Sequence, residues 1–498
     1  MLLDIIFENT EKYISLVPKE NRKEIAQFFT EKETARYMAS LFSNLNSVDK
    51  IHILDPGTGT GILTAALLER ICANEKIKSI YITFYENDSK VINLLKENIN
   101  LMVSYCNSKK TKLNFQLIED NFIIKNEDKW NKNIAEFDIV ICNPPYKKIQ
   151  KNSQEACVMS SIVYGQPNLY ALFLAMSVNV TKEEGELCFI IPRSWTTGLY
   201  FYKLREFLFT HFTVRNVHLF ISRNDLFSND KILQETIILH GKKIKSRATD
   251  IISISSSNNS KTFEESNILR INYNSCIQNF NGRYMFLPMN NEDVQLLNRL
   301  NSFSNTLLTL GYKLKTGRVV EFRSKNQIKK KKQANTIPLL WAYHFREGRI
   351  KFPVNNEKQY FKDVEGNVGI ANNNYLLIKR FTTKDDHKRL QPAIYLGKDT
   401  IDCDTITMEN HVNYLCKNEG FLTQQEVYGF YAIFNSSLWD HYYRIQNGNT
   451  QVNSNEINSM PLPAIKDIIN LGDALILAHD LSTVTCDRLI EEVLFRED

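Results

Sequence analysis

Short apolar runs alternate with helical stretches between residues 51 and 240. The apolar runs predict buried strands at Ile51–Leu54, Ile80–Tyr85, Phe115–Ile118, Ile139–Cys142, Leu187–Ile191 and Thr236–Leu239. Between them, segments such as Ile62–Ala73 and Ser89–Ile99 carry apolar residues at helical spacing. This alternation is typical of a mostly parallel sheet with helices on both faces. The first half of the chain is therefore predicted to be an α/β domain with a mixed, mostly parallel sheet.

The regular alternation stops in the middle of the chain. Residues 241–262 are rich in Ser, Asn and Lys, which predicts a domain boundary. Beyond it, short mixed runs predict an irregular α+β domain, and Asp473–Phe495 has the apolar stripe of a C-terminal helix. We therefore divide the chain into a first domain at 1–245, a linker and boundary region at 246–300, and a second domain at 301–498.

The composition is that of an ordinary globular protein. The 498 residues include 61 Lys and Arg and 56 Asp and Glu, for a net charge of +5, and 43% of the residues are hydrophobic. No run approaches the roughly 18 apolar residues of a membrane span, and the acidic N-terminus is unlike a signal peptide. The nine cysteines are scattered with no C-x-x-C pair, which argues against a disulfide framework and a Cys-rich zinc site. We expect a cytoplasmic protein with reduced thiols, no membrane contact and no metal.

A glycine-rich turn follows the first predicted strand. Asp55 ends the strand, and Gly57, Gly59 and Gly61 follow at G-x-G-x-G spacing. Glycines at such a turn let the backbone adopt positive φ and approach a ligand closely. The carboxylate of Asp55 suits a ligand that carries an ammonium and a sulfonium better than a pyrophosphate. A strand–turn–helix corner without a ligand is the alternative.

Acidic residues also follow the next two predicted strands. Glu86 ends the second strand, where an acid commonly binds both hydroxyls of a ribose, although Asp88 beside it suits a helix N-cap. Asp120 follows the third strand, and Phe122 lies two residues further on. A carboxylate there can accept a hydrogen bond from an adenine amino group while an aromatic ring covers the base. An ordinary acidic loop is nearly as good an explanation for Asp120.

The fourth strand leads directly into Asn143-Pro144-Pro145-Tyr146. Ligands of open α/β sheets bind at the carboxyl ends of strands. The prolines fix the backbone, so the side-chain oxygen of Asn143 and the carbonyl of Pro144 form a rigid pair of acceptors. This pair suits an amino group on a planar ring, and Tyr146 offers a flat face for stacking.

Together these segments resemble the Taq-type, or gamma-class, S-adenosylmethionine-dependent DNA adenine-N6 methyltransferases. Among them, the Pst/Bsu-type enzymes of restriction-modification systems are the most similar. Thr30, at the end of Gln27-Phe-Phe-Thr, resembles the methionine-binding segment, although Glu31 stands where the family usually has proline. Phe227, in Asp225-Leu-Phe, resembles the second aromatic that holds the target base.

The resemblance implies a Rossmann-like methyltransferase domain followed by a target-recognition domain. It implies methyl transfer from S-adenosylmethionine to N6 of an adenine that is flipped out of double-stranded DNA. In that mechanism Asn143, Pro144 and Tyr146 act on the target nitrogen, and Tyr146 and Phe227 stack on the base. The residues implied to hold the cofactor are Thr30, Asp55, Gly57, Gly59, Glu86, Asp120 and Phe122. It leaves open whether a cognate restriction endonuclease is separately encoded and implies no stable complex with one, and we expect the methyltransferase to act as a monomer.

Positive charge is concentrated in one segment of the second domain. Gly311–Lys332 contains nine Lys or Arg and one acid, so its net charge of +8 exceeds that of the whole chain. Local positive charge of this kind suits phosphate binding. For the four consecutive lysines Lys329–Lys332, the alternative is a solvated loop without a DNA contact. The DNA-binding candidates are Arg318, Arg323, Lys329, Lys330, Lys331 and Lys332.

Two other functions compete with DNA methylation. Asn-Pro-Pro-Tyr also occurs in protein glutamine N5-methyltransferases, whose amide substrate presents the same geometry, but these enzymes lack a large basic C-terminal domain. A decayed, non-enzymatic DNA-binding protein would show damaged motifs, whereas Gly57–Gly61 and Asn143–Tyr146 are intact. No convincing nuclease pattern follows residue 240.

Overall fold

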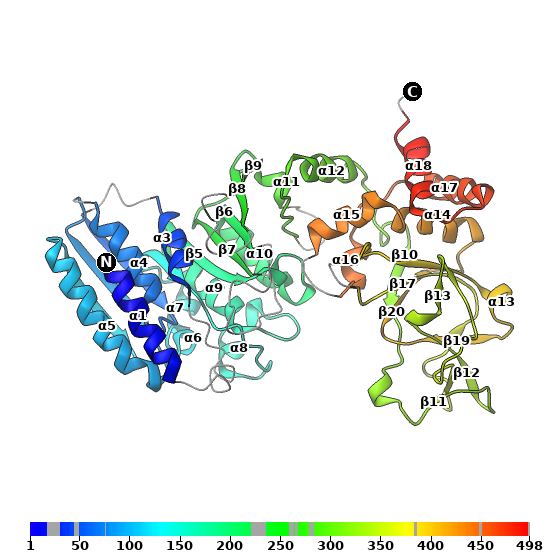
Figure 1. Ribbon diagram of the computed structural model, residues 1–498, viewed down its shortest axis with the longest axis horizontal. Coiled ribbons are helices and arrows are strands. Elements are labelled where there is room, and N and C mark those ends of the chain that lie inside the picture. Colours follow the sequence, from blue (N-terminus) through cyan, green and yellow to red (C-terminus); the bar gives the residue numbers. More distant parts are fainter. Residues whose placement is uncertain are drawn as a thin grey trace. The chain divides into compact units, whose positions relative to one another are not determined.

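The computed structural model describes residues 1–16, 30–43, 49–74, 76–220, 236–257, 263, 267–277, 283–382, 386–447 and 451–496 (Figure 1). The chain forms two compact units, Met1–Asn291 and Glu292–Asp498. Each unit has its own sheets and hydrophobic core, and each is described by itself.

The first unit is built on a nine-stranded sheet with the order β3-β2-β1-β4-β5-β7-β6-β8-β9. Strands β3 to β5 along this order are parallel neighbours, whereas β7 is antiparallel to both β5 and β6. The sheet is therefore mixed and mostly parallel, which confirms the predicted fold class. The strands are β1 (Lys50–Pro56), β2 (Ser79–Tyr85), β3 (Lys112–Ile118), β4 (Phe137–Cys142), β5 (Thr181–Pro192), β6 (Thr213–Phe220), β7 (Thr236–Lys242), β8 (Ile251–Ser257) and β9 (Ile268–Asn272).

Helices cover both faces of this sheet. On one face, the helices α1, α3, α4 and α5 share a core cluster with Ile139 and Ile141 of β4. Val140 points to the opposite face because side chains alternate along a strand, and the almost wholly buried helix α9 packs there against β5. The helices of the unit are α1 (Leu2–Leu16), α3 (Lys32–Ser40), α4 (Ile62–Cys72), α5 (Ser89–Ser108), α6 (Phe122–Lys125), α7 (Glu127–Lys132), α8 (Gln154–Val158), η1 (Ser160–Ile162), α9 (Leu169–Val180), η2 (Arg193–Thr196), η3 (Leu199–Phe201), α10 (Tyr202–His211) and α11 (Tyr273–Cys276).

The sheet extends further along the chain than the sequence pattern indicates. Strand β6 carries polar residues, and β8 and β9 lie inside the expected linker at 246–300. In the structure, His218 of β6 is buried and shares hydrogen bonds with Ser255 Oγ at 2.8 Å and Ser257 Oγ at 2.9 Å of β8. Because these polar side chains satisfy each other, the strands are buried without an apolar run. The division between units lies at Asn291 rather than across 246–300.

The second unit contains two sheets of short strands. A six-stranded sheet has the order β10-β20-β17-β18-β14-β13, and a five-stranded sheet has the order β11-β15-β12-β19-β16. Helices complete the irregular α+β unit that the sequence predicts. The strands are β10 (Tyr312–Thr316), β11 (Ile328–Lys329), β12 (Thr336–Leu340), β13 (Phe345–Arg346), β14 (Arg349–Ile350), β15 (Tyr360–Lys362), β16 (Ile370–Ala371), β17 (Asn374–Lys379), β18 (Pro392–Leu396), β19 (Thr405–Met408) and β20 (Val412–Lys417). The helices are α12 (Asn291–Asn301), η5 (Glu321–Arg323), η6 (Ala342–His344), α13 (Gly397–Thr400), α14 (Gln424–Phe434), α15 (Ser437–Gln446), α16 (Ser454–Asn458), α17 (Ile465–Ala478) and α18 (Thr483–Leu494).

The predicted C-terminal helix at Asp473–Phe495 is two helices in the structure. α17 ends at His479, which has φ of 53°, and α18 begins after a Ser482 N-cap. α17 packs against α14 at very close range. A Cβ atom on Gly429 of α14 would lie 1.9 Å from the carbonyl oxygen of Ile468, and one on Gly472 of α17 would lie 1.9 Å from that of Gln425. Only glycine allows the two backbones to approach this closely.

Candidate active site

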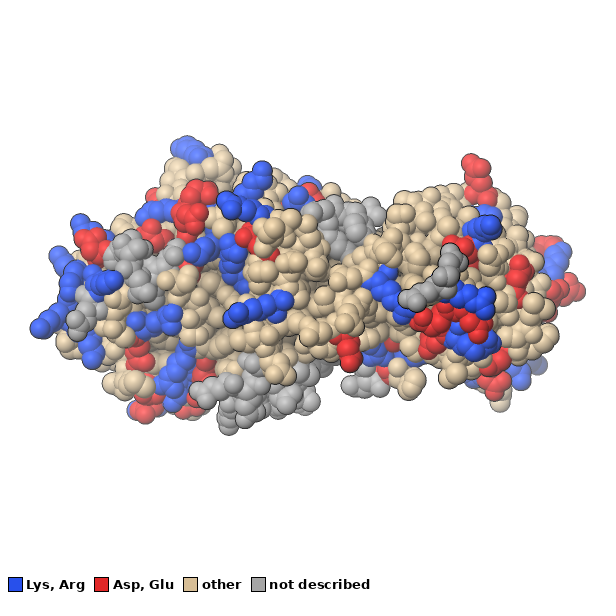
Figure 2. Space-filling view, turned by 90° about the horizontal axis from the view of Figure 1, so that it is seen from above, with Lys and Arg blue, Asp and Glu red and all other residues tan. Residues whose placement is uncertain are grey.

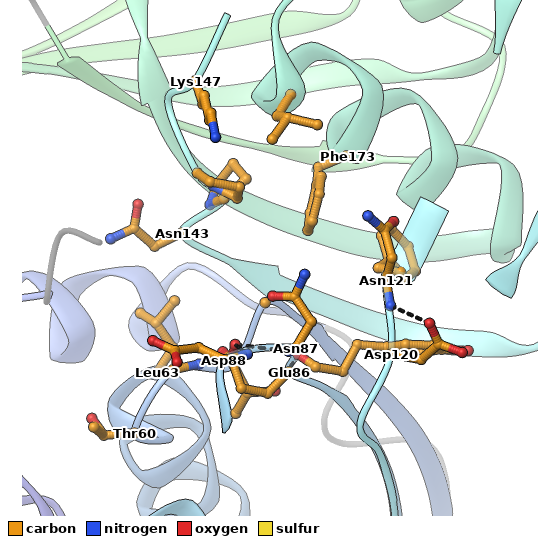
Figure 3. Close-up of a pocket in the computed structure, with 18 of the residues that line it drawn as sticks. Thr60, Leu63, Glu86, Asn87, Asp88, Asp120, Asn121, Asn143, Lys147 and Phe173 are labelled. Carbon is orange, nitrogen blue, oxygen red and sulfur yellow. Dashed lines mark hydrogen bonds between the residues drawn. The ribbon is translucent and has the colours of Figure 1, made fainter. Parts of the chain in front are cut away.

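A pocket of about 320 Å³ lies at the carboxyl ends of β1, β2, β3 and β4 (Figure 3). Its walls come from the loop after each of these strands and from the start of α9. The lining residues are Thr30, Gly57–Thr60, Ile62, Leu63, Tyr85–Asp88, Asp120–Phe122, Asn143–Pro145, Lys147, Glu155, Leu169 and Phe173. Four separate motifs of the sequence therefore meet at one cavity.

The glycine-rich loop forms one wall of this pocket. Gly57, Gly59 and Gly61 have φ angles of 76°, 59° and 87°, a left-handed region that favours glycine. The N–H groups of Gly57 and Thr58 both donate to the carbonyl of Tyr85 at 2.9 Å, which ties the loop to the end of β2. A Cβ atom on Gly57 would lie 3.3 Å from the ring of Phe173 across the pocket. The glycines thus keep a narrow slot open.

Asp55 does not lie on the pocket wall. Its side chain is buried at 1% exposure, and the hydroxyl of Thr64 donates to Asp55 Oδ2 at 2.6 Å. Burial raises the pKa of Asp55 to about 7, although the hydrogen bond from Thr64 opposes this shift. The contact with a cationic ligand stays a prediction, because the carboxylate is outside the pocket lining and is bonded to Thr64 in the first turns of α4. Asp55 holds the loop to that helix.

Glu86 lies between the glycine loop and the end of β2. Its Oε2 accepts the N–H of Gly59 at 2.8 Å, and its Oε1 accepts the N–H groups of Asn87 and Asp88 at 2.8 Å each. Burial is the largest influence and raises the pKa of Glu86, and the three backbone donors oppose it. Oε2 has only this one hydrogen bond among those described, so it retains acceptor capacity toward the pocket. Asp88 is the N-cap of α5, as the alternative interpretation has it, and accepts from the N–H of Lys90.

Asp120 and Phe122 lie on the wall formed after β3. Asp120 is half exposed and accepts the N–H of Asn121 at 2.7 Å. The ring of Phe122 is 2% exposed and contacts Tyr85 at 5.1 Å and Phe173 at 5.2 Å between centroids. These three rings give the pocket an apolar end with a carboxylate at its rim.

Asn143 faces the pocket and is held from two sides. Its Nδ2 donates to the hydroxyl of Thr30 at 3.1 Å, and the hydroxyl of Tyr146 lies 3.1 Å from its Oδ1. The Tyr146 hydroxyl also lies 2.9 Å from the carbonyl oxygen of Ile190, and its single proton can be donated to only one of these two acceptors. Tyr146 itself is half-buried behind Asn143 and does not line the pocket.

Some pocket residues carry no signal in the sequence. Phe173 lies among apolar neighbours in the almost wholly buried α9, so its sequence context is that of any core residue. For Thr30 the sequence predicts only a cofactor contact, but this residue also orients the amide of Asn143. Phe227, the expected second aromatic, falls in 221–235 and lies outside the described residues.

The basic candidates of the second unit lie on its surface. Arg318, Arg323 and Lys330–Lys332 are exposed, and Lys329 of β11 is partly buried. Arg318 donates to the carbonyl of Asn367 at 3.0 Å, and Lys330 pairs with Glu357 at 3.3 Å. On the face drawn in Figure 2, basic and acidic side chains are intermixed over most of the surface. The concentration of positive charge in Gly311–Lys332 is therefore a local feature of the chain, whose net charge is +5.

Two further features concern metals and membranes. Among the residues with a described placement, there is no group of three or more His, Cys, Asp or Glu that could hold a metal ion. None of the described helices is long and apolar enough to cross a membrane.

The sheet order, the glycine loop and the polar residues at the strand ends define the class of this protein, which has a Rossmann-like methyltransferase fold. A family model described as Eco57I restriction-modification methylase matches residues 63–227. The chain is 30% identical over 496 residues to the type II methyltransferase M.BsuBI of Bacillus subtilis, covering 96% of this chain and 95% of that one. It is 29% identical over 472 residues to M.PstI of Providencia stuartii, covering 91% and 90%.

Solved structures share the fold. A nuclease-deletion mutant of the type ISP restriction-modification enzyme LlaGI, in complex with a DNA substrate mimic, matches with a TM-score of 0.50 and 13% identity. The match covers 91% of this chain and 55% of that one. By its similarity to M.BsuBI over nearly the full length of both chains, the protein belongs to the type II methyltransferases of restriction-modification systems. Membership in this family disfavours the glutamine methyltransferase alternative.

Proposed function

We propose that this enzyme transfers a methyl group from S-adenosylmethionine to N6 of an adenine in double-stranded DNA. The observation that carries the proposal is the position of Asn143 on the wall of the pocket at the strand ends, with its amide held by Thr30. The amino group of a target adenine placed beside this amide would lie at the opening of the pocket that is proposed to bind S-adenosylmethionine.

The residues around the pocket fit S-adenosylmethionine. Phe122 and Phe173 form an apolar slot of the right chemistry for an adenine ring, and Asp120 at its rim can accept from the ring's amino group. The free acceptor capacity of Glu86 suits the ribose hydroxyls. Thr30 and the open backbone of Gly57 and Gly59 are positioned to contact the amino-acid end. When bound there, the cofactor supplies an activated methyl group on its sulfonium.

Asn143 and Pro144 prepare the nucleophile. The exocyclic nitrogen of adenine is a poor nucleophile because its lone pair is delocalised into the ring. Two oxygen acceptors, Asn143 Oδ1 and the Pro144 carbonyl, draw its N–H bonds out of the ring plane and localise the lone pair. The same contacts aim the nitrogen at the methyl group, and positioning of this kind can contribute up to about 7–11 kcal/mol.

The hydroxyl of Tyr146 helps to orient the amide of Asn143. It lies within hydrogen-bond distance of Asn143 Oδ1 and of the carbonyl oxygen of Ile190, and an amide oxygen has two lone pairs, so Oδ1 can accept from the target amino group beside Tyr146. Burial raises the pKa of Tyr146 well above its usual value, so the hydroxyl keeps its proton throughout the neutral range. The half-buried ring offers a face for the flipped adenine, with Phe227 as the proposed second aromatic.

The second unit is proposed to recognise the DNA target. Its surface basic residues, Arg318, Arg323 and Lys329–Lys332, are candidates for phosphate and base contacts. Because a single pocket serves a single flipped base, the enzyme is proposed to act as a monomer. It is proposed to act in the cytoplasm, where its DNA substrate would lie, and a separately encoded endonuclease would recognise the same sequence.

Long-read sequencing tests the proposal most directly. A methylation-deficient host expressing this protein should acquire N6-methyladenine at one sequence context, and the context defines the target site. A palindromic six-base site such as CTGCAG is the expectation from the Pst-type resemblance. Expression of Asn143→Ala in the same host is the matched control, and it should leave that context unmodified. Absence of adenine methylation with the wild-type protein would refute the proposal.

A further inference from the structure

Phe322 lies on the short turn η5 with most of its ring in solvent. The side chain is 70% exposed, more than any other aromatic side chain that the structure describes. Single exposed apolar residues are common on protein surfaces, so exposure alone indicates nothing. Two further observations distinguish this one: the turn beneath it is held by hydrogen bonds and an ion pair, and it lies in the most basic segment of the second unit.

The turn is fixed to the body of the second unit. The N–H groups of Arg323 and Ser324 donate to the carbonyls of Val320 and Glu321 at 3.1 and 3.0 Å. The side chain of Glu321 is held by the ammonium group of Lys358 at 2.6 Å. Immediately before the turn, Val319 is buried in a small core, whose other members are Leu339, Trp341 and Phe361. Phe322 is therefore presented on a preorganised support.

Phe322 lies in the basic segment Gly311–Lys332. The guanidinium carbon of Arg323 lies 5.3 Å from the centre of the Phe322 ring, and Arg318 and Lys325 on either side of the turn are exposed. Glu321 is the only acid between Gly311 and Lys332, and its carboxylate is paired with Lys358. Duplex DNA has a negatively charged backbone and an interior of stacked, largely apolar bases. An exposed aromatic ring among basic residues is complementary to both features.

We propose that Phe322 inserts between bases of the bound duplex and acts as a wedge that opens the base stack. The inference rests on the proposed function, because it takes duplex DNA as the substrate. Apolar side chains inserted at a base step partly unstack it and kink the helix. Because an adenine must leave the stack before it can react, a local opening of the duplex lowers the cost of that step. Arg323 beside the ring would contact the phosphate of the opened step.

Three variants separate the wedge from other roles. Phe322→Ala removes the ring, and Phe322→Leu keeps an apolar tip. Phe421→Ala is the matched control, because Phe421 is 56% exposed in the same unit but lies outside the basic segment. Affinity is measured by fluorescence anisotropy with a labelled duplex that contains the methylated sequence. Unwinding is measured by relaxing a plasmid with topoisomerase in the presence of each protein and comparing the topoisomers.

The wedge predicts a distinct pattern of results. Phe322→Ala should bind the duplex about tenfold more weakly, as loss of a base–aromatic stack would do, and should unwind the plasmid less. The slope of affinity against salt should not change, because the apolar ring neutralises no phosphate. Arg323→Ala should instead reduce the slope by about one unit. Phe322→Leu should retain most of the affinity and unwinding, and Phe421→Ala should match the wild type.

Other outcomes would overturn the inference. If the wild-type enzyme methylates DNA and Phe322→Ala matches it in affinity and unwinding, the wedge is wrong while the proposed function stands. If Phe322→Ala changes the sedimentation coefficient instead, the ring covers a second copy of the chain and not DNA. If the wild-type protein neither binds nor methylates duplex DNA, the proposed function itself fails.

Discussion

Strands β1 to β4 of the first unit are runs of six or seven residues, whereas β11, β13, β14 and β16 of the second unit have two residues each. In the first unit, these parallel strands end at one edge of the sheet, and the pocket lies in the loops along that edge. In the second unit, short strands are held by close helix contacts and by side-chain hydrogen bonds. The pocket therefore depends on the loops at one edge, and the proposed DNA-binding surface depends on the packing beneath it.

The largest effect is expected from Asn143→Ala in the first unit. It removes one of two acceptors for the target nitrogen, and loss of such a preorganised group typically costs about 10²–10³ in turnover. Binding of cofactor and DNA should persist, because neither depends mainly on this side chain. Methyl transfer from tritiated cofactor to duplex DNA measures the rate. Asn107→Ala on the exposed end of α5 is the control, and near-normal turnover by Asn143→Ala would exclude the proposed chemistry.

Gly429→Ala tests the packing of the second unit. The new methyl group would lie 1.9 Å from the carbonyl oxygen of Ile468, and neither helix backbone can yield easily. We expect a loss of about 3 kcal/mol in unfolding free energy, seen as a lower urea midpoint. Gly311→Asn is the control: φ is 83°, which asparagine tolerates, and nothing lies within 4 Å of the added Cβ. Equal stability of the two variants would contradict the close approach of the helices.

Glu86→Ala should weaken cofactor binding about 10- to 100-fold, the range for loss of a hydrogen bond to a charged group. The change also removes the acceptor for the N–H of Gly59, so the glycine loop should become less ordered. Isothermal titration with S-adenosylmethionine gives the affinity. Glu86→Gln, which keeps the shape and one oxygen, should lose less. Unchanged affinity in folded Glu86→Ala would remove this residue from the cofactor site.

Replacement of Lys329–Lys332 by serine should lower DNA affinity equally for all sequences. For every phosphate that is no longer neutralised, the slope of log affinity against log salt should flatten by about 0.9. Titrations at several salt concentrations measure it. As a control, four exposed lysines of the first unit, Lys90, Lys96, Lys109 and Lys110, are replaced in the same way. If both variants behave alike, the four-lysine segment is a solvated loop.

The smallest effect concerns two buried glutamates, one in each unit. Burial raises the pKa of Glu186, but hydrogen bonds from His240 and Ser43 outweigh it and lower the pKa to about 2, with Lys242 also in contact. Its contribution to stability is present above the unfolded pKa of 4.5 and is lost as the pH falls toward 2. Burial raises the pKa of Glu456 in the second unit, so its effect on stability has the opposite pH dependence. The free energy of unfolding should fall as the pH rises from 4.5 toward the raised folded pKa.

Urea titrations between pH 2 and 7 separate these two glutamates. Glu186→Gln should be destabilised at neutral pH, and its difference from the wild type should shrink below the unfolded pKa of 4.5. Glu456→Gln, which resembles the protonated side chain, should differ most from the wild type at neutral pH in the stabilising direction. A constant penalty for Glu186→Gln at all pH values would show that its charge has no role.

The sequence by itself determined most of the first unit and the composition of its pocket. The apolar runs are long enough to specify strands, and Ile139–Cys142 is buried as predicted, whereas Phe115 of β3 is 43% exposed. The motifs that follow these strands must meet at one edge of a parallel sheet. For this reason the sequence pattern alone assigns Gly57, Glu86, Phe122 and Asn143 to a common site, and all four line the pocket.

Only the tertiary structure decided the features that depend on long-range partners. β6 and β8 are buried because His218 of β6 forms hydrogen bonds with Ser255 and Ser257 of β8. Their polar residues do not form the apolar run from which a buried strand is predicted. Asp55 points away from the pocket because the hydroxyl of Thr64, in the first turns of α4, donates to its carboxylate. Phe173 reaches the pocket from a helix that is buried on every side. In each case the local sequence is compatible with several structural roles. The contact that the side chain makes with another element of the fold determines which role it has.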